Sequence, residues 1–153
     1  MGISEQQRGN MTITVYGMPA PQGSKRHVGR GIMIESSAKV KPWREAVKWA
    51  AVEAMARPDH MPDAPMIRGP VRISVAFTLP RPKSRPKREL WPDRKPDLDK
   101  LVRSTLDAIV DAGAIEDDAR VIEVRAWKVF PGGLAGLNVP GALIRIEAVE
   151  GAR

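Results

Sequence analysis

Apolar and polar residues alternate in two segments of the chain, residues 11–17 and 71–79. A period of two is typical of β-strands that bury one face and expose the other. Residues 32–34, 121–130 and 139–149 are also rich in apolar side chains and are expected to form strands. The pattern therefore predicts a sheet of about five strands.

Two other segments repeat their apolar residues at helical spacing. The first, residues 36–57, can be capped by a serine at its start and would bury Trp43 and Val47 on one face. The second, residues 99–112, is followed by Gly113, a natural C-terminal cap.

Together these elements predict an α+β fold, with a mixed sheet and two main helices. The length fits one domain, which we expect to span residues 11–150 after a flexible polar tail of residues 1–10.

The balance of charge points to an anionic partner. The chain has 25 lysines and arginines against 18 acidic residues, a net charge of +7. A surplus of this sign attracts polyanions such as nucleic acids, although basic residues also serve solubility. The cations gather in residues 22–30 and 81–95. Prolines in the second segment exclude a helix or an inner strand, so we expect an exposed, basic, mobile loop.

Several classes of protein are excluded by composition. The chain has no cysteine, which rules out disulfides and thiolate chemistry, and its two histidines argue against a zinc site. No apolar run approaches the roughly 20 residues that span a bilayer, and the polar N-terminus lacks a secretory segment. We therefore expect a cytoplasmic protein with no membrane partner and no organic cofactor.

Candidate chemistry lies in two pairs of aspartates. Asp97 and Asp99 flank Leu98, and in extended geometry they would point the same way while Leu98 points into the core. Two carboxylates on one side suit a hard cation such as Mg²⁺, which takes oxygen ligands. Asp99 alone could simply cap the helix. That alternative leaves Asp97 and the second pair, Asp117 and Asp118, unexplained.

Two cations accompany the first pair. Arg103 lies one turn after Asp99 and can sit beside the carboxylates. It could bind the scissile phosphate and stabilise the charge that builds on it, or form an ordinary ion pair with Asp99 or Asp107. Lys100 could share either role.

These residues resemble the RusA family of Holliday junction resolvases. The family pattern is Pro-Asp-x-Asp-Asn, a lysine three residues on, Asp-Ala, Asp-Asp and a later lysine. The matching residues here are Pro96-Asp97-Leu98-Asp99, Asp107-Ala108, Asp117-Asp118 and Lys128. The segment Gly17–Arg26 is also similar, so the resemblance spans residues 12–149. Lys100 replaces the usual asparagine and Arg103 the usual lysine, and a guanidinium differs from an ammonium in geometry.

The resemblance implies a homodimer that binds a four-way DNA junction and makes two symmetry-related nicks. It also implies Mg²⁺ or Mn²⁺, held by Asp97, Asp99 and Asp118. Phage DNA processing, recombination and repair are the settings it implies for a bacterial or phage-encoded protein.

Chain length limits how the carboxylates can meet. Residues 99–112 extend about 21 Å as a helix, and residues 113–118 cover at most about 17 Å. Asp118 therefore does not easily return to Asp97 and Asp99 of its own chain. In a two-fold dimer with antiparallel helices, it would approach the partner's pair instead. A helix face of mostly small side chains could let two helices approach, or could pack on its own sheet: Leu101, Thr105, Ala108 and Ala112.

We therefore expect metal-assisted phosphodiester hydrolysis in which Arg103 joins the three carboxylates. Trp91 and Phe130 could stack on bases at an opened branch point, or anchor loops. The alternatives are a nuclease for flaps or other branched nucleic acids, and a non-catalytic basic DNA-binding module. The cations expected to bind DNA are Lys25, Arg26, Arg81, Lys83, Arg85, Lys87, Lys100 and Lys128.

Overall fold

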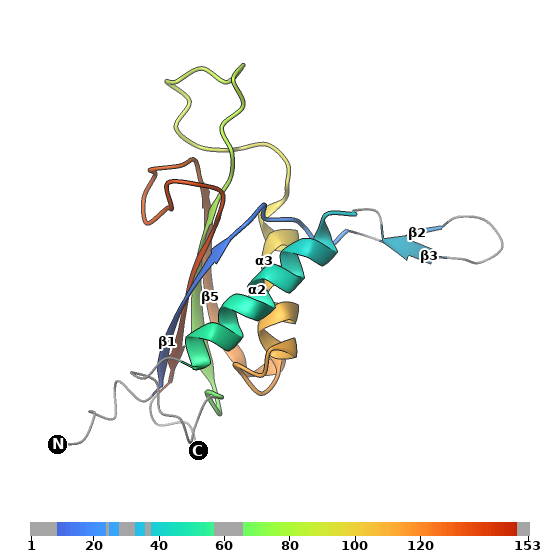
Figure 1. The fold of residues 1–153 in the computed structure, drawn as a ribbon, viewed down its shortest axis with the longest axis vertical. Coiled ribbons are helices and arrows are strands. Elements are labelled where there is room, and N and C mark those ends of the chain that lie inside the picture. The colour runs from blue at the N-terminus through green and yellow to red at the C-terminus, as the bar shows by residue number, and fades with distance from the viewer. Residues whose placement is uncertain (1–8, 24, 28–32, 36–37, 57–65, 150–153) are drawn as a thin grey trace.

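Two helices lie against one face of a mixed sheet (Figure 1). The computed structural model describes residues 9–23, 25–27, 33–35, 38–56 and 66–149. The strands of the sheet are, in spatial order, β1 (Asn10–Tyr16), β6 (Gly141–Ala148), β4 (Val71–Thr78) and β5 (Val121–Val129). Strand β6 is antiparallel to β1 and β4, whereas β4 and β5 are parallel. The helices are α2 (Val40–Met55) and α3 (Leu98–Asp111).

The core lies between the sheet and the helices. On β4, Ile73, Val75 and Phe77 are buried at alternate positions, as the period of two predicted. Trp43 and Val47 of α2 are buried in the same cluster. The α+β class, the two main helices and the mixed sheet are thus confirmed.

The expected count of about five strands in one sheet is wrong, because the main sheet has four. The short strand expected at residues 32–34 is β3 (Met33–Glu35), which pairs with β2 (Lys25–His27) in a separate two-stranded sheet. This hairpin stands away from the main sheet, beyond the start of α2 (Figure 1). A short apolar segment can satisfy its backbone with the nearest strand in sequence, and here that strand is β2.

Helix α2 begins later than expected. Its N-cap is Lys39, which makes no side-chain cap hydrogen bond. The serines expected to cap it, at residues 36–37, and the polar tail at residues 1–8 lie outside the described residues. No helix in the described part of the chain is both long and apolar enough to cross a membrane.

The small-residue face of α3 packs within its own chain. Leu101, Thr105 and Ala108 are buried, and the Trp43 indole donates a hydrogen bond to the Thr105 hydroxyl at 3.1 Å. This face is therefore not available to a second copy of the helix, and the alternative of packing in its own core is the correct one.

The basic segment between β4 and α3 forms neither helix nor strand, as its prolines predicted. It is the long loop beyond the end of β4 at the top of Figure 1, and it returns directly into the start of α3. The loop therefore delivers its last residues to the acidic pair at that helix end.

Candidate active site

The first acidic pair sits at the N-terminus of α3. Asp97 is the N-cap in extended geometry, yet its side chain makes no cap hydrogen bond and is 51% exposed. Asp99 is exposed in the first helical turn. The helix begins at Leu98, one residue earlier than expected, so only Asp97 is extended. Leu98 packs against the core, as predicted, and both carboxylates remain on the surface at the positive end of the helix dipole.

Two cations border this pair. The Lys100 ammonium lies 3.5 Å from an Asp97 oxygen, and Arg103 is exposed one turn further along α3. Since both are at the surface, the Lys100–Asp97 pair is worth little in stability. It does keep a positive charge beside the carboxylate.

The second pair lies just after α3, at a single 3₁₀ turn, η1 (Asp118–Arg120). Asp117 caps this turn by accepting a hydrogen bond from the Ala119 amide at 3.2 Å. A hydrogen bond from the Asp118 carboxyl lowers the pKa of Asp117. The same contact and the charge of Asp117 raise the pKa of Asp118, and the charge of Asp107 raises it further. Neighbouring carboxylates repel one another when both are ionised, and a cation bound beside them would relieve this repulsion.

The two pairs do not meet within one chain. Across the residues that the structure describes, no three acidic or histidine side chains come close enough to hold a metal ion together. Asp118 lies near Asp107, which is about 12 Å beyond Asp99 along the helix axis. The arrangement agrees with the chain-length argument that Asp118 does not easily return to its own Asp97 and Asp99.

The donor set fits a hard divalent cation in type, because all the candidate ligands are exposed carboxylates. Within the described part of one chain, neither the pair at the start of α3 nor the pair after its end brings three such carboxylates together. A metal site with three protein carboxylates would need a second group of ligands from elsewhere.

Lys128 binds the backbone of the segment that precedes the first pair. From strand β5, its ammonium donates hydrogen bonds to two carbonyls of the loop, those of Arg94 at 2.8 Å and Pro96 at 2.9 Å. These carbonyls belong to the segment that leads into Asp97. These contacts hold the segment in place. The contact of Lys128 with DNA stays a prediction.

Two arginines of the basic loop are turned inward. The Arg85 side chain is only 4% exposed and binds Glu89, Asp93 and the Trp91 carbonyl. The Arg81 guanidinium lies 4.1 Å over the Phe130 ring and donates to the carbonyls of the loop, at Pro86 and Glu89. Both were expected to bind DNA as parts of a mobile loop. Their contacts pin the loop from within, and Phe130 serves as its anchor.

Other cations expected at DNA remain on the surface. Lys83 and Lys87 are exposed on the loop, and Trp91 of the same loop is 53% exposed. Lys25 and Arg26 lie on β2, but their side chains are outside the described part of the structure. The role of these residues in DNA binding stays a prediction.

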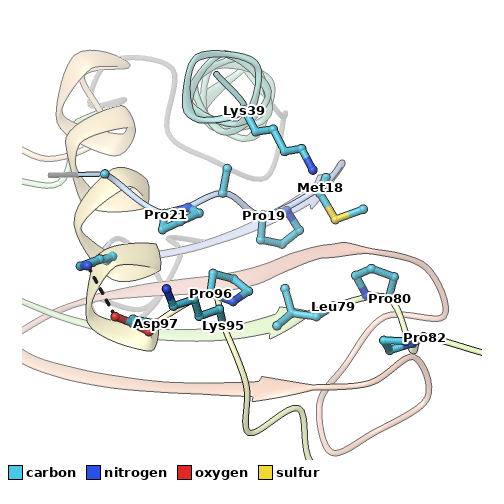
Figure 2. A pocket seen from close by; sticks show the side chains of 13 residues that line it. Met18, Pro19, Pro21, Lys39, Leu79, Pro80, Pro82, Lys95, Pro96 and Asp97 are labelled. Carbon is cyan, nitrogen blue, oxygen red and sulfur yellow. Dashed lines mark ion pairs between the residues drawn. The ribbon is translucent and has the colours of Figure 1, made fainter. Parts of the chain in front are cut away.

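A cleft next to Asp97 was missed in the sequence. Three segments far apart in the chain form it, residues 18–23, 79–82 and 95–100, together with Lys39 (Figure 2). Prolines on both walls were interpreted only as loop formers, because a single sequence does not show which loops meet.

Exposed carboxylates beside cations, on a small basic α+β domain, are compatible with an enzyme that acts on phosphodiesters. The comparisons with known proteins give the class directly. Residues 16–146 match the family model described as endodeoxyribonuclease RusA. The chain belongs to the RusA endodeoxyribonuclease family. It is also similar to the uncharacterized protein YqaN of Bacillus subtilis (strain 168), with 31% identity over 130 residues that cover 77% of this chain and 86% of that protein.

Proposed function

We propose that the chain resolves four-way DNA junctions by paired, metal-dependent phosphodiester hydrolysis. The observation that carries the proposal is the two exposed carboxylate pairs, at Asp97 with Asp99 and at Asp117 with Asp118, on a member of this endodeoxyribonuclease family. Both pairs are placed by the same helix, one at its start and one just after its end.

The proposed ligands for Mg²⁺ or Mn²⁺ are Asp97, Asp99 and Asp118. Such a cation, when bound, polarises a phosphate and lowers the pKa of a bound water. Arg103 would stabilise the negative charge that builds on the phosphate, since it is exposed one turn beyond Asp99. Lys100 would hold the neighbouring phosphate, as its ammonium already lies beside Asp97.

We propose that the active enzyme is a homodimer in which Asp118 of one protomer completes the site of the other. The separation of the two pairs within a protomer supports this arrangement. A surface suited to a second copy lies directly after Asp118. Within the described sheet, β5 is an edge strand, and its Ile122 and Val124 are 58% and 40% exposed. An apolar edge strand of this kind readily pairs with another chain.

The DNA arms would be held through their phosphates by the exposed cations, independently of base sequence. Lys83 and Lys87 are the described candidates, and Lys25 and Arg26 of the projecting hairpin would extend the same surface.

The test compares cleavage of a synthetic four-way junction with that of a linear duplex of the same sequence, with and without Mg²⁺. The wild type should make paired symmetric nicks in the junction only when metal is present. Asp99→Asn should abolish the nicks, whereas Asp111→Asn, a change at an exposed aspartate of the same helix that pairs with Arg44, should leave them intact.

Other outcomes would identify other functions. Equal or faster cleavage of a flap would make the chain a nuclease of different structural preference. Tight junction binding without nicks, unchanged in Asp99→Asn, would make it a DNA-binding module and would remove the catalytic assignments.

A further inference from the structure

The cleft beside Asp97 has two facing walls. Pro19 and Pro21 of the segment after β1 lie on one side, and Pro96 with Leu79 lies on the other (Figure 2). The space between them is about 560 Å³. Cavities that hold small organic ligands usually range from about 300 to 1,000 Å³, so a single nucleotide fits.

Both walls are held by hydrogen bonds to the elements that carry the candidate site. On one wall, the Gln22 amide donates to the Lys100 carbonyl at 3.0 Å, and the Ser104 hydroxyl donates to the Ala20 carbonyl at 2.7 Å. On the other, Lys128 holds the Pro96 carbonyl. The cleft is therefore built into the fold, and its position relative to α3 is fixed.

The lining combines an apolar interior with charges at the rim. Met18, Leu79 and the prolines supply the apolar surface. In the view of Figure 2, the Lys95 side chain appears between those of Pro96 and Asp97 and points toward the opposite wall. Lys100 is at the same end, paired with Asp97. A nucleotide has the complementary form, with a flat, weakly polar base and an anionic phosphate. Proline rings are rigid and apolar and lose almost no side-chain freedom on contact, so they suit the faces of a base.

We propose that this cleft binds one unstacked nucleotide of the DNA strand, with its base between the prolines and its phosphate beside Lys95 and Lys100. The inference rests on the proposed function and deepens it, because it names what the enzyme takes from an opened branch point. A base is easiest to extrude where stacking is already interrupted. A cleft that demands an extruded base therefore favours junctions over continuous duplex.

The test uses a four-way junction with one 2-aminopurine, placed in turn at each nucleotide around the branch point, and bound in EDTA. This base is quenched when stacked and brightens when it leaves the stack. None of the described residues that line the cleft is aromatic, so the cleft itself should not quench it. Wild-type protein should brighten one position.

Met18→Trp places a bulky, quenching ring at an exposed lining position and should abolish this brightening while the junction still binds. Leu134→Trp, at an exposed position away from the cleft, should brighten the probe as the wild type does. As a second variant, Lys95→Gln should weaken the brightening and lower the salt dependence of binding by about one phosphate contact. Lys48→Gln, at an exposed lysine of α2 that does not line the cleft, should leave the brightening unchanged.

The proposal is overturned if no position brightens in a bound junction, or if Met18→Trp brightens it as the wild type does. If the wild type nicks the junction but brightens no position, the nucleotide site falls and the nuclease stands. If it neither binds nor nicks the junction, the proposed function falls together with the site.

Discussion

Lys128 makes contacts within the protein that its position in the sequence did not predict. Its position in the family pattern and its charge indicate a DNA contact, but its ammonium binds two carbonyls more than thirty residues earlier in the chain. A lysine that reaches backbone across this distance in sequence has no local signature. The placement of Asp97 and Asp99 at the start of α3, by contrast, was predictable, because their spacing and the start of the helix are local features.

Lys128→Met should therefore lower the rate of cleavage and leave DNA affinity almost unchanged. The loss of its two hydrogen bonds frees the segment that places Asp97, and changes around metal ligands typically cost about 10- to 100-fold in activity. Single-turnover cleavage and junction affinity would be measured on the same preparation.

The matched change is Lys83→Met, at an exposed lysine of the basic loop. It should weaken binding, chiefly at low salt, and leave the single-turnover rate of bound junction unchanged. A Lys128→Met protein that loses affinity but cleaves bound junction at the normal rate would show that Lys128 contacts DNA after all.

At the scale of elements, the bounds of the two helices and of the four strands of the main sheet were largely predictable. Residues with strong local preferences mark the ends of these elements. Gly113, for example, has a φ of 79° just after α3, a conformation that glycine adopts without strain. The pairing of β3 with β2 and the internal structure of the basic loop were not predictable. Both depend on contacts between segments, and a lysine or arginine in a loop has the same sequence signature whether it faces solvent or, as Arg85 does, the interior.

Arg85 should hold the basic loop closed. Arg85→Met removes its contacts with Glu89, Asp93 and the Trp91 carbonyl, and we expect the loop to lose about 1–2 kcal/mol of local stability. Trypsin should then cut faster at Lys87 and Arg88, while the midpoint of urea unfolding changes little. Lys83→Met is the control, and equal cleavage rates in the two variants would contradict the role of Arg85.

The same contact predicts a dependence on pH. The hydrogen bond and charge of Arg85 lower the pKa of Asp93. The stability that the Arg85–Asp93 contact gives the loop is complete above the ordinary aspartate pKa. It is lost as the pH falls through the lowered pKa of Asp93. Amide exchange in the loop, corrected for its intrinsic rate, should therefore increase below about pH 4 in the wild type. In the Asp93→Asn protein, the loop amides should exchange faster already at neutral pH. Identical exchange in the two proteins would exclude a role of the Asp93 charge in holding the loop.

At the scale of the whole molecule, the separated acidic pairs and the exposed edge of β5 both support the proposed dimer. Each protomer carries two separated carboxylate pairs, and the apolar residues Ile122 and Val124 follow the second pair directly. The spacing of α3 predicted the separation. The exposure of these two residues was not predictable, because exposure on an edge strand depends on where the neighbouring helix ends.

Ile122→Asp should place a charge in this surface and shift the protein from dimer to monomer. Because the site would then lack Asp118 of a second protomer, cleavage should fall by at least about 100-fold. Sedimentation and junction cleavage would be measured together. Val139→Asp, also at an exposed apolar residue, should change neither. A fully active Ile122→Asp monomer would exclude both the surface and the shared site.

Subunit mixing tests the shared site most directly. Asp99→Asn and Asp118→Asn should each be inactive alone. After subunit exchange, each mixed dimer would hold one site with all its carboxylates, so about one quarter of all sites should recover and make single nicks. The mixture of Asp97→Asn with Asp99→Asn should stay inactive, since both changes affect the same group of ligands. If mixed dimers of Asp99→Asn and Asp118→Asn form, as shown by differently tagged protomers, and remain as inactive as this control, the active site is not shared between protomers.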